Sequence, residues 1–198
     1  MNYYGPKDLA ESFRTVRKNT LIIAEDIPEE KYGFRAADGT QTVGELLTHI
    51  AFCGRFQERV VLIEQRTSMA DFDFIGFRNA LMAELHQPRT KAEIVKLLVT
   101  EGEKYATAVE SLSEEFVAQS IMLPPGGTQA SRTRFDLLLS VKEHEMHHRG
   151  QLMLIERMLG MTPHLTRDNQ ARMAAMRARM GNQHSGQATP DPAPRATA

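Results

Sequence analysis

The chain has no tryptophan and a single cysteine, Cys53, among its 198 residues. One cysteine cannot form an internal disulfide, and the N-terminal segment lacks the basic and apolar regions of a signal peptide. The sequence therefore predicts a cytoplasmic protein. An apolar run of the roughly 20 residues needed to cross a bilayer is also missing, which argues against a membrane protein.

An excess of charge of either sign is lacking too. Lys and Arg number 24 against 25 Asp and Glu, so the formal net charge is -1. A nearly neutral chain has no general attraction to nucleic acid or to an anionic membrane surface. We therefore expect neither as a partner. With 41% apolar residues, the chain is long enough for one sizeable core.

Alternating apolar and polar residues, which are typical of strands, are not evident, whereas helical spacing recurs along the chain. The sequence predicts an all-α fold with four long helices over residues 6–26, 42–65, 90–112 and 133–160, and a shorter helix over residues 72–86. Thr42 and Thr90 each begin a Thr-x-x-Glu capping box, and Thr133 begins a weaker Thr-x-x-Asp version. Residues 123–131 read as a turn-rich loop.

The last part of the chain differs in composition. A basic segment with three methionines predicts a short C-terminal helix over residues 166–180, and the Gly, Pro, Ala, Ser and Thr after it cannot bury enough apolar surface to order themselves. The expected organisation is therefore a bundle with a metal site over residues 1–165, this short helix, and a disordered tail over residues 181–198.

Histidines interrupt two of the predicted apolar helix faces. In the last long helix, one face with spacings of three and four contains Leu137, Val141, His144, His148, Gln151, Ile155 and Met158. The corresponding face of the second helix contains Leu46, His49, Cys53, Phe56, Val60 and Ile63. The sequence therefore predicts that three buried histidines meet in the bundle core.

Buried imidazoles need partners for their nitrogen atoms, because an unpaired buried polar group costs a few kcal/mol. A divalent metal ion supplies such a partner. His144 and His148 are one helical turn apart, and His49 from the facing helix completes a three-histidine site with positions left open for water or substrate. Cys53, one turn from His49, is either a small apolar residue or a thiolate that approaches the metal.

The segment also spells H-E-x-x-H through His144, Glu145 and His148, the zinc-protease motif. A protease of that class needs a third ligand beyond the motif. The metzincin extension is absent, and Glu156 lies eight residues after His148 on the same helix, about 12 Å along its axis. A di-iron bundle needs a second E-x-x-H motif, which is also missing. A mononuclear three-histidine site remains.

TVGELLTHI in the second helix and HEMHHRGQL in the last helix resemble the DinB-like family, also described as DinB/YfiT-like metalloenzymes. The resemblance covers roughly residues 6–165 and implies an up-up-down-down four-helix bundle with a long crossover. The family's metal ligands are one histidine on the second helix and an H-x-x-x-H pair on the fourth. They correspond here to His49, His144 and His148.

The resemblance implies a metal site more firmly than a reaction. Our preferred interpretation is a thiol-dependent S-transferase, in which zinc, nickel or iron activates a low-molecular-weight thiol toward an electrophile. The alternatives are a hydrolase with metal-activated water, and a non-catalytic, metal-stabilised dimeric bundle for stress response or ligand binding. Gln151, His147 and Glu145 are candidates to orient the metal ligands or to act as a base. A homodimer is compatible with all three alternatives.

Overall fold

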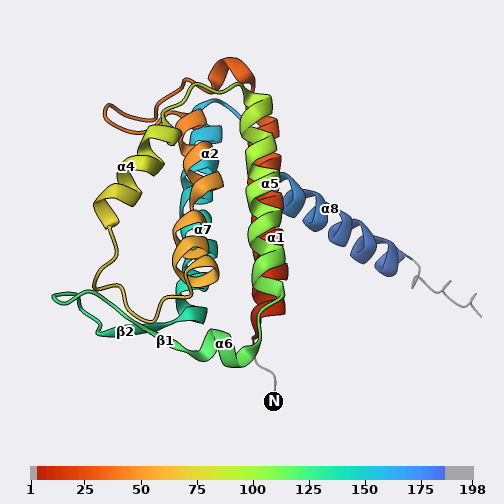
Figure 1. Cartoon of the computed structure of the whole chain (residues 1–198). Coiled ribbons are helices and arrows are strands. Elements are labelled where there is room, and N and C mark those ends of the chain that lie inside the picture. Colours follow the sequence, from red (N-terminus) through yellow and green to blue (C-terminus); the bar gives the residue numbers. More distant parts are fainter. Residues whose placement is uncertain (1–3, 186–198) are drawn as a thin grey trace, which may run out of the picture. The chain divides into compact units, whose positions relative to one another are not determined.

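The computed structural model describes residues 4–185 and divides the chain into two compact units, Met1–Met161 and Thr162–Ala198. The first unit is a bundle of four long helices, α1 (Pro6–Asp26), α2 (Val43–Phe52), α5 (Lys91–Glu110) and α7 (Arg134–Met158) (Figure 1). The predicted all-α class and four-helix bundle are therefore confirmed.

The four helices do not follow the predicted order of directions. α1 and α2 both contact α5 and α7, so α1 and α2 lie on a diagonal of the bundle. α1 and α7 run in one direction and α2 and α5 in the other (Figure 1). The loop after α1 turns the chain back: Tyr32 donates to the Ala24 carbonyl, and Gly44 N–H donates to the Tyr32 carbonyl. The predicted crossover between α2 and α5 is present, but the order is up-down-down-up.

Helix starts follow the predicted capping residues. The Thr42 hydroxyl accepts from Glu45 N–H at 3.1 Å while the Glu45 carboxylate accepts from Thr42 N–H at 2.8 Å. Thr90 begins α5 with the same reciprocal pair. Thr133 caps α7 by accepting from Asp136 N–H at 3.0 Å. These side chains satisfy amide groups that have no partner within the first turn of a helix.

The second predicted helix, 42–65, is interrupted. α2 ends at Phe52, and a short α3 (Arg55–Gln57) and a π-helical segment, η2 (Glu58–Ile63), follow. Gly54 lies at the break, where an added Cβ would be 3.1 Å from the Tyr105 ring on α5. The close approach of α5 to the chain at Gly54 explains why a glycine stands there, and glycine lowers helix propensity.

The remaining elements of the first unit are short. They are η1 (Glu29–Lys31), α4 (Phe74–Leu85) in the crossover, α6 (Glu114–Ala118), β1 (Ser120–Met122) and β2 (Ser131–Thr133). α4 is the predicted shorter helix. β1 and β2 pair antiparallel, with Ile121 opposite Arg132. Residues 120–133 therefore form a small hairpin. The predicted loop over residues 123–131 connects its strands, except that Ser131 belongs to β2 and pairs with Met122.

Two apolar clusters fill the bundle. One gathers around Phe13, Tyr105 and Leu138, and the other around Ile50, Leu98 and Leu152. α1 and α7 each contribute residues to both clusters. On each helix a buried charged residue lies between the part that packs in one cluster and the part that packs in the other. The first of these residues is Arg17, and the second is Glu145. This pair bears directly on the histidine site.

The second unit contains α8 (His164–Ser185). This helix spans the segment predicted as a short helix over residues 166–180 and continues to Ser185, into the segment that the composition predicted to be disordered. The rest of that segment, residues 186–198, lies outside the described residues. Across residues 4–185, no helix is long and apolar enough to span a membrane.

Candidate metal centre

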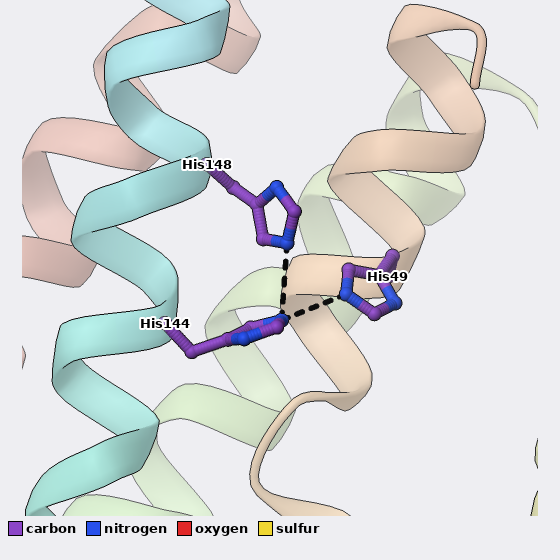
Figure 2. A group of neighbouring side chains, drawn as sticks. All are labelled: His49, His144 and His148. Atoms are coloured by element: carbon purple, nitrogen blue, oxygen red, sulfur yellow. Dashed lines mark hydrogen bonds between the residues drawn. The ribbon is translucent and has the colours of Figure 1, made fainter. Parts of the chain in front are cut away.

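The three predicted histidines come together between α2 and α7. His49 extends from α2, and His144 and His148 extend from successive turns of α7 toward it (Figure 2). The Nε2 atom of His144 is 2.8 Å from Nε2 of His49 and 3.0 Å from Nε2 of His148. One ligand atom from each ring lies within 4.8 Å of the others. The group therefore has the composition and spacing of a site that can hold a metal ion.

Hydrogen bonding among the rings does not satisfy this arrangement. A neutral imidazole has one N–H donor and one acceptor nitrogen. The His144 Nε2 atom faces two other Nε2 atoms, so its single proton or single lone pair would have to serve both. Three nitrogens that bind one tetrahedral zinc ion lie roughly 3.3 Å apart, given Zn–N bonds of about 2.0–2.1 Å. The two distances from Nε2 of His144, 2.8 and 3.0 Å, are within about half an ångström of that value.

The electrostatics of the cluster keep the rings neutral. Desolvation, followed by the neighbouring His148 and His144, lowers the pKa of His49 to about 4. Desolvation also lowers the pKa of His144 and of His148 below the usual value for histidine. Metal ions bind neutral imidazole. The rings are therefore in the protonation state that a metal requires at neutral pH.

The histidines are less buried than the sequence predicted. His144 is exposed, and His49 and His148 are half-buried. The predicted face of α7 also contains Gln151, which is exposed, and Met158, which is half exposed. Leu137, Val141 and Ile155 of the predicted face are buried, and they are joined by residues outside that face, namely Leu138, Glu145 and Leu152. Because the core extends to this neighbouring side of α7, the histidine cluster is at the edge of the bundle and can be reached by solutes.

Gln151, a predicted candidate to orient the metal ligands, forms a hydrogen bond with His148. The Gln151 Oε1 atom lies 2.7 Å from Nδ1 of His148. An amide oxygen only accepts, so Nδ1 carries the proton and Nε2 presents its lone pair to the cluster. His147 is exposed and lies outside the cluster, with its Nε2 atom 3.4 Å from Nε2 of Gln151. The network fixes one tautomer of a candidate ligand.

We expect Gln151→Ala to weaken metal binding by about 10- to 100-fold, because loss of a hydrogen-bonding partner behind a metal-binding histidine has this typical effect. Gln151→Glu keeps an acceptor for the His148 Nδ1–H group and should retain most of the affinity. Competition with a coloured chelator measures both dissociation constants. Equal affinities for the native protein and Gln151→Ala would contradict the role assigned to Gln151.

Glu145, the central residue of the H-E-x-x-H motif, does not join the cluster. Its buried carboxylate accepts three hydrogen bonds from Arg17, at 2.9, 3.1 and 2.9 Å. Arg17 also donates to the carbonyl oxygens of Leu98 at 2.6 Å and Ile50 at 3.2 Å. Glu145 follows His144, and Ile50 follows His49. The ion pair therefore ties together the backbone neighbours of two candidate ligands.

Sequence reasoning did not identify Arg17. It lies on α1 among charged, polar and apolar residues, and nothing in its local sequence distinguishes it from a surface arginine. The structure shows why a glycine is present at position 102 of α5. A Cβ at Gly102 would be 2.8 Å from Nη1 of Arg17. The guanidinium passes directly over the backbone of α5 at this glycine.

A cavity of about 270 Å³ opens beside the cluster. Its lining residues are His49, Phe52, Cys53, Phe56, Gln57, Leu81, Ser140, Val141 and His144. None of them is acidic. Burial raises the pKa of the Cys53 thiol to about 12. This favours the first of the two predicted roles for Cys53, a small, protonated apolar residue in the cavity wall.

We expect Cys53 to react with iodoacetamide about a hundredfold more slowly than a free cysteine at pH 8. A pKa of about 12 leaves little thiolate, and the greater nucleophilicity of a more basic thiolate offsets part of that loss. Intact-mass spectrometry follows the reaction, and no other cysteine in the chain competes. The same reaction in guanidinium chloride provides the control. Rapid labelling of the folded protein would show that the thiol is reactive.

The fold and the cluster together define a four-helix bundle with a three-histidine site that is able to hold a metal and opens onto a cavity. Comparison with known sequences identifies the family. The family model of the DinB superfamily matches residues 12–152. The chain belongs to the DinB superfamily.

Similar proteins share the fold over most of their length. YjoA of Bacillus subtilis strain 168 is 28% identical over 155 residues, which cover 78% of this chain and 90% of the relative. The crystal structure of YjoA, described as a DinB-like protein, aligns at 25% identity with a TM-score of 0.58 over 78% of this chain and 92% of that one.

Two further solved structures are similar at lower sequence identity. YfiT of Bacillus subtilis, described as a probable metal-dependent hydrolase with an unusual four-helix bundle topology, has a TM-score of 0.62 at 14% identity and covers 79% of this chain and 89% of its own. A protein from Streptococcus pneumoniae has a TM-score of 0.59 at 14% identity, with coverage of 79% and 93%. At these identities the similarity establishes the fold.

Proposed function

We propose that this protein is a metal-dependent, thiol-dependent S-transferase. His49, His144 and His148 bind a divalent ion, zinc, nickel or iron, and a low-molecular-weight thiol reacts at this centre with a small electrophile. The observation that carries the proposal is the convergence of three neutral Nε2 atoms at the edge of a cavity. Three protein ligands with an open side are typical of catalytic rather than structural metal sites.

A bound divalent ion supplies positive charge that lowers the pKa of a coordinated thiol, so that thiolate is present at neutral pH. In the proposed reaction a carbon–sulfur bond forms, the leaving group departs from the electrophile with the bonding electrons, and the thiol proton is released to solvent. Gln151 holds His148 in the tautomer that this centre needs.

The cavity supports a thiol rather than water as the nucleophile. Its lining contains no carboxylate, and the nearby Glu145 is held by Arg17. A free thiol has a pKa of about 8.5 and needs a shift of only about two units to ionise at neutral pH, whereas water needs the full lowering from about 15.7 to about 7 that a catalytic zinc ion provides. The protonated Cys53 thiol does not compete as a nucleophile.

Metal-dependent hydrolysis is a second candidate. The description of YfiT as a probable metal-dependent hydrolase supports it by analogy of fold. His147 supports it from this chain, because its exposed ring lies with its centroid 5.1 Å from that of His148 and could accept a proton from water. In this reaction water adds to the substrate, one bond breaks, and each product takes up part of the water.

A two-part assay tests the proposal. Metal content is measured by elemental analysis of the native protein and of His148→Ala. The metal-loaded protein is then assayed with cysteine, glutathione, bacillithiol and mycothiol, each with a bimane or chlorodinitrobenzene electrophile, and with nitrophenyl esters in the absence of thiol. We expect about one metal ion per chain, and thiol-dependent turnover that is lost in His148→Ala.

The outcomes separate the candidate functions. Ester cleavage without thiol, again lost in His148→Ala, would replace the transferase by the hydrolase. Stoichiometric metal with no turnover in any assay would support the non-catalytic, metal-stabilised bundle, for which a dimer is detectable by light scattering. Failure of the native protein to bind metal would overturn the metal centre itself.

A further inference from the structure

The cavity beside the histidines has mainly apolar walls. Phe52 and Phe56 follow His49 on the α2–α3 side, Val141 lies on α7, and Leu81 on α4 closes another side. No lining residue is charged at neutral pH, because none is an acid, a lysine or an arginine, the two histidine rings are neutral, and the Cys53 thiol is protonated. Burial of a charged group without a partner is costly. A ligand group that fills this space is therefore uncharged and largely apolar.

The cavity volume limits the size of that group. A protein cavity of about 150 Å³ accommodates benzene, which has six non-hydrogen atoms. By the same ratio, the 270 Å³ of this cavity accommodates about ten or eleven non-hydrogen atoms. Such a volume suits one small molecule or one arm of a larger one.

The Gln57 side chain brings a buried acceptor without a partner to the cavity wall. Gln57 Nε2 donates to the Ser140 hydroxyl at 3.2 Å, and Ser140 donates its own proton to the Leu137 carbonyl at 2.6 Å. These two bonds identify which amide atom of Gln57 is the nitrogen and which is the oxygen, because Ser140 has no proton left to give to Gln57 Oε1. The Gln57 Oε1 atom is buried and accepts no hydrogen bond. A buried, unpaired acceptor is costly in the free protein.

Gln57 lines the same cavity as His49 and His144. Ser140, to which Gln57 is bonded, precedes His144 by one helical turn, about 6 Å along the axis of α7. A ligand that extends from the histidines through the cavity thus passes Gln57. The oxygen itself is closed to water, so a ligand donor reaches it after rotation of the amide about its last torsion, which is soft.

We infer that the cavity binds an uncharged, mainly apolar substrate arm of about ten non-hydrogen atoms, and that Gln57 accepts a hydrogen bond from a hydroxyl or amide donor on that arm. The inference rests on the proposed function, because the reacting end of the same molecule lies at the histidine centre. It adds a substrate class and a specificity-determining residue to that function.

Hydroxamates are suitable probes because they bind a divalent metal through two oxygen atoms, whatever reaction the enzyme catalyses. Acetohydroxamate reports on the metal alone. Heptanohydroxamate adds an apolar arm, and 6-hydroxyhexanohydroxamate replaces its terminal methyl group by a hydroxyl group. Dissociation constants are measured by calorimetry on the zinc-loaded full chain. The probes thus separate metal binding, cavity binding and the hydrogen bond.

Two variants with matched controls test the two parts of the inference. Leu81→Trp fills the cavity, while Met82→Trp places the same ring at the next position on α4, which does not line the cavity. Gln57→Leu removes the acceptor at similar volume, while Gln57→Asn keeps one. Thermal unfolding shows whether each variant is folded. Gln57→Leu should lose little stability, because it removes the long Gln57 Nε2–Ser140 hydrogen bond together with the unpaired oxygen, and the two effects oppose each other.

We expect heptanohydroxamate to bind the native protein at least about tenfold more tightly than acetohydroxamate, since each buried methylene group contributes. Leu81→Trp should remove this gain, and Met82→Trp should keep it. Gln57→Leu should weaken the hydroxyl probe about tenfold relative to the methyl probe, as expected when a buried hydroxyl group loses its acceptor.

Each failure has a separate meaning. If acetohydroxamate binds but the longer probes bind no better, the cavity inference is overturned and the metal centre stands. If the ratio of the two long probes is the same in Gln57→Leu and in the native protein, Gln57 is not the acceptor. If no probe binds because the chain holds no zinc, the proposed function itself has failed.

Discussion

His144→Ala should reduce the affinity for a divalent metal by more than about a hundredfold, because it removes a ligand, whereas loss of a supporting residue alone costs 10- to 100-fold. His144 is the ligand to choose because its Nε2 atom lies 2.8 Å from that of His49 and 3.0 Å from that of His148. Elemental analysis after purification and chelator competition at pH 7.5 measure the loss.

His147→Ala is the matched control, since His147 is exposed on the same helix and lies outside the cluster. It should retain about one metal ion per chain. The folded state of His144→Ala is checked by circular dichroism, and little change is expected because His144 is itself exposed. Retention of native metal affinity in His144→Ala, or equal loss in both variants, would show that these three histidines are not the metal site.

The composition of the cluster could be predicted from sequence because helical spacing is a local property. His144 and His148 are four residues apart, so they share a face in any α-helix. His49 followed from a similar spacing on another helix. These inferences required only that α2 and α7 face each other, and the contacts of α2 with α7 confirm that they do.

The depth of the cluster could not be predicted in the same way. Helical spacing gives the relative positions of residues on a face, but not which face meets the core when polar and apolar residues are mixed. On α7 the polar Glu145 is fully buried, while Gln151 and Met158 from the predicted buried face are exposed or half exposed. A carboxylate in the core is favoured only when it has a partner, and that partner, Arg17, is 128 residues away in sequence.

Helix interruptions posed a related difficulty. The apolar pattern from Thr42 to Gln65 continues through the break after Phe52, so periodicity alone indicates one helix. The break falls at Gly54, where a Cβ would lie 3.1 Å from the Tyr105 ring of α5, and this close approach is a tertiary feature that periodicity does not show. The hairpin posed the same difficulty. It pairs Ile121 with Arg132 across a loop, and strands of only three residues are too short to show an alternating pattern in the sequence.

The buried ion pair has the second large expected effect. Arg17→Met should reduce the free energy of unfolding by about 3–5 kcal/mol, because it leaves the Glu145 carboxylate buried without its three hydrogen bonds. For a protein of this size, the unfolding midpoint should fall by roughly 10 °C. Urea and thermal unfolding, monitored by circular dichroism at neutral pH, measure the change.

The double variant Arg17→Met with Glu145→Leu separates two contributions to the free energy of unfolding. One is the net stabilisation by the ion pair, and the other is the cost of leaving one charge buried alone. With both charges replaced by apolar groups, no buried charge remains unpaired, and stability should return to within about 1–2 kcal/mol of native. A double variant as unstable as Arg17→Met would mean that the lost stability comes from packing.

Metal affinity in the same variants tests whether the ion pair also positions the ligands. Arg17 bonds to the carbonyl of Ile50, next to His49, and to Glu145, next to His144. Without it, the spacing between α2 and α7 at the cluster is less tightly fixed. We therefore expect about tenfold weaker metal binding in the folded double variant, by analogy with other residues that support metal ligands. Native affinity there would limit the role of the pair to stability. Restored stability with weakened affinity would instead explain why this fold keeps a charged pair in its core beside an exposed histidine cluster.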